Sequence, residues 1–152
     1  PHIAYVIDDV CFTGDVGGVR LPGETHVQPP LVPPELDLDR WRKSLATLRT
    51  AVERHDVTHL APTHFGLFDD VEAHLDRLER GLDAADEWVR DTLPPLADDE
   101  EALQQAAAEW MRGQADADGV DDATWDLYEL ADPSWMQALG LRRYWKKHVQ
   151  SA

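Results

Sequence analysis

Every strand-like segment of this sequence lies within its first 68 residues, and the remainder has helical spacing. Ile3 to Ile7 and Val10 to Thr13 are short apolar runs separated by Asp8-Asp9, a pattern typical of a β-hairpin with largely buried strands. Thr58 to Ala61 is a third short strand. Because strands come first and helices follow, the sequence predicts an α+β fold.

The remaining elements follow from helical periodicity and from breakers. Residues 14–34 are rich in glycine and proline, so we expect a long loop there, which in a compact domain is usually functional or disordered. Asp37 or Asp39 can cap a helix that ends near Arg54, with one apolar face formed by Trp41, Leu45, Leu48 and Val52. Further helices are predicted over about 71–93, 98–115, 122–130 and 132–149.

Charge separates the helices from the strands. The chain has 152 residues and a formal net charge of −16, which argues against nucleic acid or an anionic membrane as the main partner. Residues 69–132 hold 21 acids and 4 bases, whereas the last 20 residues hold 4 bases and no acid. Asp supplies 20 of the 30 acids and Lys only 3 of the 14 bases, which suits a surface that stays hydrated in concentrated salt. We therefore expect a salt-adapted, cytoplasmic protein, with an ordinary acidic domain as the alternative.

Two strand ends carry residue types that bind metals. Asp15 follows a strand in Phe12-Thr13-Gly14-Asp15, and His64 follows another in Pro62-Thr63-His64-Phe65-Gly66. A strand fixes the position of a ligand, and the adjacent glycine leaves room for a cation and a substrate. Taken singly, Asp15 also fits a turn or cap residue and His64 a structural histidine.

In this order the segments resemble the C-terminal half of the metallo-β-lactamase superfamily. Ile3-Ala4-Tyr5-Val6 is similar to the strand after the family's third motif, and the segments with Asp15 and His64 are similar to its fourth and last motifs. The resemblance covers residues 1–92 and implies the C-terminal half of a four-layer αββα sandwich. Residues 93–152 then form a helical extension, whose end resembles the tail of one subgroup of uncharacterised hydrolases. The tryptophans of that extension fit either a satellite core or a surface that caps the site or forms a dimer.

The resemblance implies a metal-dependent hydrolase. Asp15 would bridge two zinc ions, with iron or manganese as alternatives, and His64 would bind the second ion. A metal-bound hydroxide would then attack a small ester or thioester. Arg20 and His26, in the loop after Asp15, are candidate substrate-binding residues, although such an Arg more often pairs with an acid of the protein. We interpret His2 as a residue that supports a ligand, with direct ligation as the alternative.

The family's His-x-His-x-Asp-His motif is absent from this sequence. Since two or three ligands cannot hold two zinc ions, we expect this chain to be inactive alone and to belong with a missing N-terminal half of the same protein. A homodimer is also expected. The alternative is a non-catalytic acidic module for interaction or dimerisation that has lost metal binding.

Overall fold

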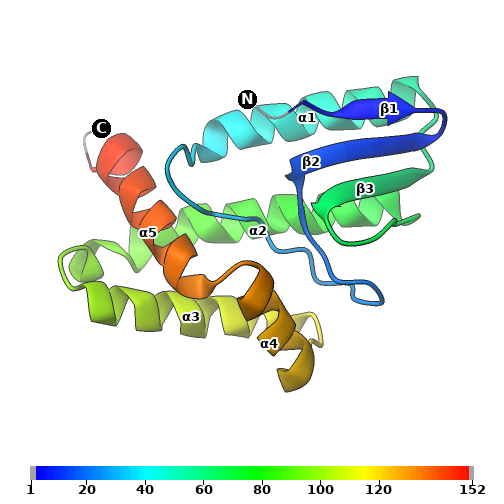
Figure 1. Ribbon diagram of the computed structural model, residues 1–152. Helices are drawn as coiled ribbons and strands as arrows, with labels where there is room; N and C mark the ends of the chain where they lie inside the picture. Colours follow the sequence, from blue (N-terminus) through cyan, green and yellow to red (C-terminus); the bar gives the residue numbers. More distant parts are fainter. Residues whose placement is uncertain (1–2, 151–152) are drawn as a thin grey trace. The chain divides into compact units, whose positions relative to one another are not determined.

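The computed structural model describes residues 3–150 and contains one small sheet and five α-helices (Figure 1). The mixed α+β class expected from the sequence is therefore confirmed. A 3-10 turn covers Pro94–Leu96, and a π-helical segment covers Trp145–Val149. The strands are β1 (Tyr5–Ile7), β2 (Val10–Val19) and β3 (His59–His64), and the α-helices are α1 (Leu38–Arg54), α2 (Val71–Asp91), α3 (Glu100–Ala117), α4 (Asp122–Ala131) and α5 (Ser134–Tyr144).

The sheet has the order β1-β2-β3. The first two strands form the predicted antiparallel hairpin, with Tyr5 opposite Phe12 and Ile7 opposite Val10. β2 and β3 are parallel, and α1 makes the connection between them, as parallel strands require. The carboxyl ends of β2 and β3 therefore lie at the same edge of the sheet.

The predicted end of the second strand is wrong. The sequence places the end of the second strand at Thr13 and a loop from Gly14 onward, but β2 continues to Val19. Its register with β3 shifts on both sides of Gly14, and Val19 still pairs with His64. Glycines at bulges bend a strand without ending it. The glycine-rich segment after Thr13 is therefore predicted as a loop although it continues the strand.

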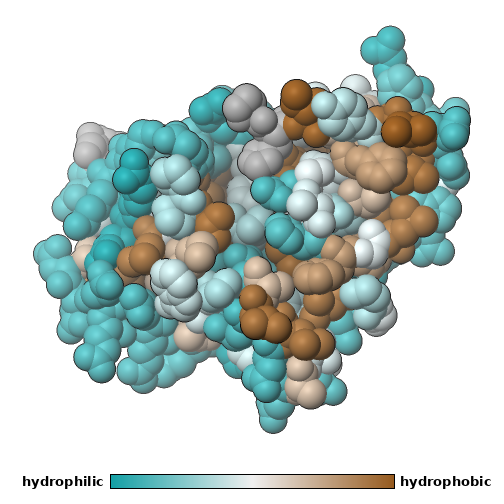
Figure 2. Space-filling model, in the orientation of Figure 1, coloured by the Kyte–Doolittle hydropathy of each residue, from teal (hydrophilic) through white to brown (hydrophobic). Residues whose placement is uncertain are grey.

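Both hairpin strands are expected from the sequence to be largely buried. This expectation is wrong, because the side chains on one face of the sheet are exposed. Cys11 and Leu60 are fully buried and lie on the face covered by α1 and the start of α2. The opposite face exposes four large apolar side chains, and we call it the open sheet face. Its members are Ile3 at 64%, Tyr5 at 59%, Ile7 at 60% and Phe12 at 44% exposure. Figure 2 shows apolar atoms grouped over this part of the sheet.

The two helices behind the sheet are held by apolar packing and by ion pairs. Leu45, Leu48 and Val52 of α1 are buried as their spacing predicts. Arg49 of α1 reaches three acids on α2, with nitrogen to oxygen distances of 2.7–3.0 Å to Glu72, Asp76 and Glu79. Trp41, at the N-terminal part of α1, donates its indole N–H to the Val16 carbonyl at 3.1 Å.

The chain divides into two compact units, which we describe separately. Unit 1 comprises residues 1–29 and 38–82, and therefore contains the sheet, α1 and the first half of α2. Unit 2 comprises residues 30–37 and 83–152, and is otherwise helical. The domain boundary expected at residue 92 concerns the family resemblance and stays a prediction.

Unit 2 has a mostly apolar interior, in which Asp132, Ser134 and Gln137 are also buried, and two of its helices are capped. Trp88 and Trp110 stack with their ring centroids 5.4 Å apart. Asp99 and Asp121 are the N-cap residues directly before α3 and α4. Each side chain accepts a hydrogen bond from a backbone N–H of the first turn. Within residues 3–150, no helix is both long enough and apolar enough to cross a membrane.

Candidate functional site

Asp15 and His64 lie together at one edge of the sheet. Nε2 of His64 is 3.5 Å from Oδ1 of Asp15, and the two side chains are 40% and 38% exposed. His64 is the last residue of β3, and Asp15 lies on the bulged part of β2. The parallel pairing of the strands thus brings together two residues that are 49 positions apart in the sequence.

The backbone next to both residues is sharply turned. Gly14, directly before Asp15, has a φ of 61°, and Phe65 and Gly66, directly after His64, have φ values of 68° and 80°. A non-glycine residue in this region of φ is uncommon, and its occurrence is enriched at functional sites. Phe65 is 45% exposed, so an apolar ring borders the site from the His64 side.

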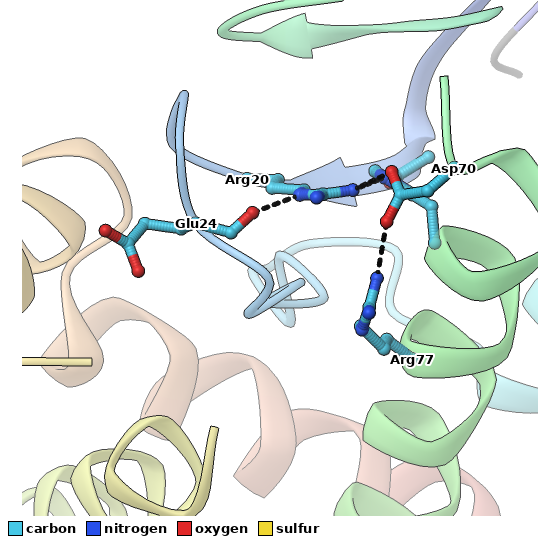
Figure 3. A network of polar contacts seen from close by, with 6 residues as sticks. Arg20, Glu24, Asp70 and Arg77 are labelled. Atoms are coloured by element: carbon cyan, nitrogen blue, oxygen red, sulfur yellow. Dashed lines mark hydrogen bonds and ion pairs between the residues drawn. The ribbon is translucent and has the colours of Figure 1, made fainter. Parts of the chain in front are cut away.

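Arg20 lies inside unit 1 and is only 7% exposed. Its Nη1 donates to Oδ1 of Asp70 at 2.6 Å, and its Nε donates to the Glu24 carbonyl at 2.6 Å (Figure 3). The same Asp70 carboxylate accepts a bond from Arg77 at 2.7 Å. Arg20 therefore has the alternative role weighed above, pairing with an acid of the protein.

Two further candidates are His26 and His2. His26 is 5% exposed, on the segment that returns to pair with Val19 through Gln28. It offers little surface to a ligand from solution. His2 lies outside the described residues.

Sequence reasoning missed His74, which is fully buried at the start of α2. Its Nε2 lies 2.7 Å from the Gly17 carbonyl, and its Nδ1 lies 3.3 Å from Nη1 of Arg20. A carbonyl only accepts and a guanidinium only donates, so the imidazole is neutral with its proton on Nε2. Burial lowers the pKa of His74, and together with the cations of Arg20 and Arg77 it outweighs the hydrogen bond to Gly17 and the charge of Asp70, which raise this pKa.

We call Arg20, Asp70, His74 and Arg77 the Arg20 cluster. Burial alone would raise the pKa of Asp70, but hydrogen bonds from Arg20 and Arg77 outweigh burial and hold it below its ordinary value. The sequence does hold a signal for the cluster, because Asp70, directly before α2, and His74 and Arg77 within α2 recur at helical spacing. Arg20, 50 residues before Asp70, carries no such signal.

The donors at the Asp15–His64 contact fit zinc in kind but not in number. A carboxylate and a neutral imidazole are both zinc ligands, and a stable site needs three or four of them. In the described part of the chain, no group of three or more His, Cys, Asp or Glu side chains is arranged to hold a metal ion. The contact is thus at most part of a metal site.

Comparisons with known proteins leave the resemblance open, because no family model, no curated protein and no solved structure matches this chain.

Proposed function

We propose that the chain supplies two metal ligands, Asp15 and His64, to a metallo-β-lactamase-like hydrolase that acts on a small ester or thioester. The observation that carries the proposal is the 3.5 Å contact between these side chains, one on the bulged part of β2 and the other at the end of the parallel strand β3. Both are accessible to solvent, as ligands of a substrate-binding centre must be. In open sheets with parallel strands, sites commonly lie beyond the carboxyl ends of the strands.

The remaining ligands come, in this proposal, from the N-terminal half of the same protein. The bound zinc ions, or iron or manganese in their place, would polarise the substrate carbonyl and lower the pKa of water. Asp15 contributes negative charge and His64 a neutral nitrogen. Arg20 and His26 are 7% and 5% exposed, so substrate contact by either would require that the chain after β2 move.

The open sheet face supports the two-half architecture. A sheet with one solvated face ordinarily carries polar side chains there. Here Ile3, Tyr5, Ile7 and Phe12 are between 44% and 64% exposed. A contiguous exposed apolar surface marks an interaction site. A second sheet packed on this face would complete the four-layer αββα sandwich and bring its own strand ends to the edge where Asp15 and His64 lie.

Metal content tests the proposal. The intact protein, with its N-terminal half, is expected to contain about two zinc ions per chain and to hydrolyse chromogenic esters or thioesters. Asp15→Ala or His64→Ala should lower the zinc content and abolish turnover. The exposed residues His55 and Asp126 provide matched controls, and His55→Ala and Asp126→Ala should change neither. An intact protein that folds without bound metal would refute the proposal.

The second candidate is a non-catalytic module for interaction or dimerisation. The same open sheet face favours it, because association through that face needs no metal. This candidate predicts a concentration-dependent dimer of residues 1–152 in sedimentation and no metal in the intact protein. The hydrolase proposal predicts that the metal content depends on Asp15 and His64 whatever the oligomeric state. The expected cytoplasmic location and salt adaptation are compatible with both.

A further inference from the structure

We propose that the Arg20 cluster is a positioning device that fixes where Asp15 lies relative to His64. It contacts both chain segments that carry these residues, although it contributes no atom to the Asp15–His64 contact itself. What Asp15 and His64 bind rests on the proposed function. How they are held in place rests on the geometry alone.

On the Asp15 side, the device acts through Gly17. His74 donates its Nε2 proton to the Gly17 carbonyl at 2.7 Å, two residues after Asp15. Gly17 is buried and lies on the bulged stretch of β2, whose register with β3 shifts after Gly14. Ladder hydrogen bonds are disrupted at a bulge, so a side chain from α2 provides a bond that the sheet does not.

On the His64 side, the device acts through Phe68. The guanidinium of Arg20 lies 4.3 Å from the centroid of the Phe68 ring, and its Nη1 holds Asp70 two residues further on. Phe68 exchanges two backbone hydrogen bonds with Leu60 of β3, at 2.8 and 2.9 Å. A Cβ on Gly66 would lie 2.8 Å from the Phe68 ring, so the turn after His64 rests directly on that ring.

The chemistry of the cluster favours positioning over simple packing. Replacing a buried ion pair by apolar side chains of similar volume is often neutral or stabilising, so the arrangement that these polar contacts fix explains the cluster better than added stability does. The neutral tautomer of His74 that donates from Nε2 to Gly17 is also the one whose Nδ1 can accept from Arg20, so each contact favours the other. Arg20 thereby links the segment after Asp15 to the segment after His64.

The test is a nuclear magnetic resonance cycle on residues 1–152, without metal, at about pH 8 where ordinary imidazoles are neutral. Asp15→Asn should displace the ring resonances of His64, because the two side chains are 3.5 Å apart. His74→Leu should reduce that displacement to less than about half, because the Gly17 segment is released. His74→Gln keeps an amide donor for the Gly17 carbonyl and should retain most of the displacement.

Two further variants serve as a control and as a substitute. His55→Leu makes the same chemical change at an exposed position of unit 1 and should leave the displacement intact. If His74→Leu does not fold, Asp70→Asn replaces it, since that change removes the charge that holds Arg20. An undiminished displacement in a folded His74→Leu or Asp70→Asn variant would overturn the inference.

A zinc titration separates this inference from the proposed function. If the wild-type intact protein binds zinc, His74→Leu should weaken its affinity by about tenfold or more, and His74→Gln by much less. If the wild type binds no zinc, the proposed function fails. The metal-free cycle still decides whether the Arg20 cluster sets the Asp15–His64 contact.

Discussion

Units 1 and 2 differ in which polar groups they bury and in where they expose apolar side chains. In unit 2 the interior is mostly apolar, the buried polar residues Asp132, Ser134 and Gln137 lie near the start of α5, and apolar side chains such as Leu130 and Trp135 are exposed on helices. Unit 1 buries the basic side chains of Arg20 and His74 and exposes four large apolar side chains on the open sheet face. Departures from the general pattern of burial are expected at functional or strained sites. The difference therefore directs attention to unit 1, where Asp15 and His64 also lie.

The two faces of the sheet in unit 1 give the sharpest test of this difference. Leu60→Thr places a hydroxyl and a cavity in the fully buried face, and should lower the free energy of unfolding by about 3 kcal/mol or more. Ile7→Thr makes a similar change at a side chain that is 60% exposed, and should change it by less than about 1 kcal/mol. Urea denaturation followed by circular dichroism measures both.

The result for Ile7→Thr shows whether the open sheet face is covered in solution. A large loss for Ile7→Thr that grows with protein concentration would mean that this face is covered by another copy in solution. A small loss, with unchanged sedimentation, leaves the face available to a different partner. Thr suits strands well, so intrinsic propensity does not obscure either result.

Unit 2 is expected to be sensitive to volume rather than to polarity. Gly140 in α5 lies against the backbone of residues 30–37, and a Cβ there would be 2.0 Å from the Leu31 carbonyl oxygen. Gly140→Ala should therefore lower the free energy of unfolding by about 2–3 kcal/mol, because neither backbone segment can move easily. Gly113→Ala in α3 meets no atom within 4 Å and should instead stabilise by about 1 kcal/mol, through helix propensity alone.

Tryptophan fluorescence during denaturation follows this pair of variants, since Trp88 and Trp110 stack within unit 2. If Gly140→Ala were as stable as the wild type, the segment 30–37 would not pack on α5 as the structure has it. Equal effects of the two alanines would remove the distinction between a packed and an open helical glycine.

The local part of the fold could be predicted from the sequence. Leu45, Leu48 and Val52 recur at helical spacing and are buried on one side of α1. The sequence indicates Asp15 and His64 as candidate ligands, and the parallel pairing of β2 and β3 accounts for their proximity, although Asp15 lies within β2 and not after it. These features depend on residues close in sequence or on a general rule of topology.

The rest depends on contacts between distant residues. In Ile3-Ala4-Tyr5-Val6-Ile7 every side chain is apolar, so alternation could not show that one face is open. His74 finds its acceptor 57 residues earlier, on a backbone carbonyl that no residue type encodes. The continuation of β2 past Gly14 likewise depends on pairing with β3 across the length of α1.

The smallest expected effect is a pH dependence that belongs to unit 1 alone. The folded-state pKa of His74 lies below the ordinary value of 6.5, so the unfolded chain takes up this proton first as the pH falls. The free energy of unfolding is then at its full value above about pH 6.5 and decreases toward the folded-state pKa of His74. Of the charged groups facing the imidazole, Arg20 and Arg77 stay cationic, and Asp70 stays ionised through this window because its own pKa lies below 3.8.

His74→Gln isolates this contribution, because every other titrating group remains in the variant. Denaturation of wild type and variant at a series of pH values from about 7 to 5 should show a smaller loss of stability in the variant, by the linkage between proton binding and folding. Parallel curves would mean that His74 takes up its proton as readily in the folded as in the unfolded chain. Burial would then not be lowering the pKa of His74, and the neutral tautomer inferred from its contacts with Gly17 and Arg20 would lose its support.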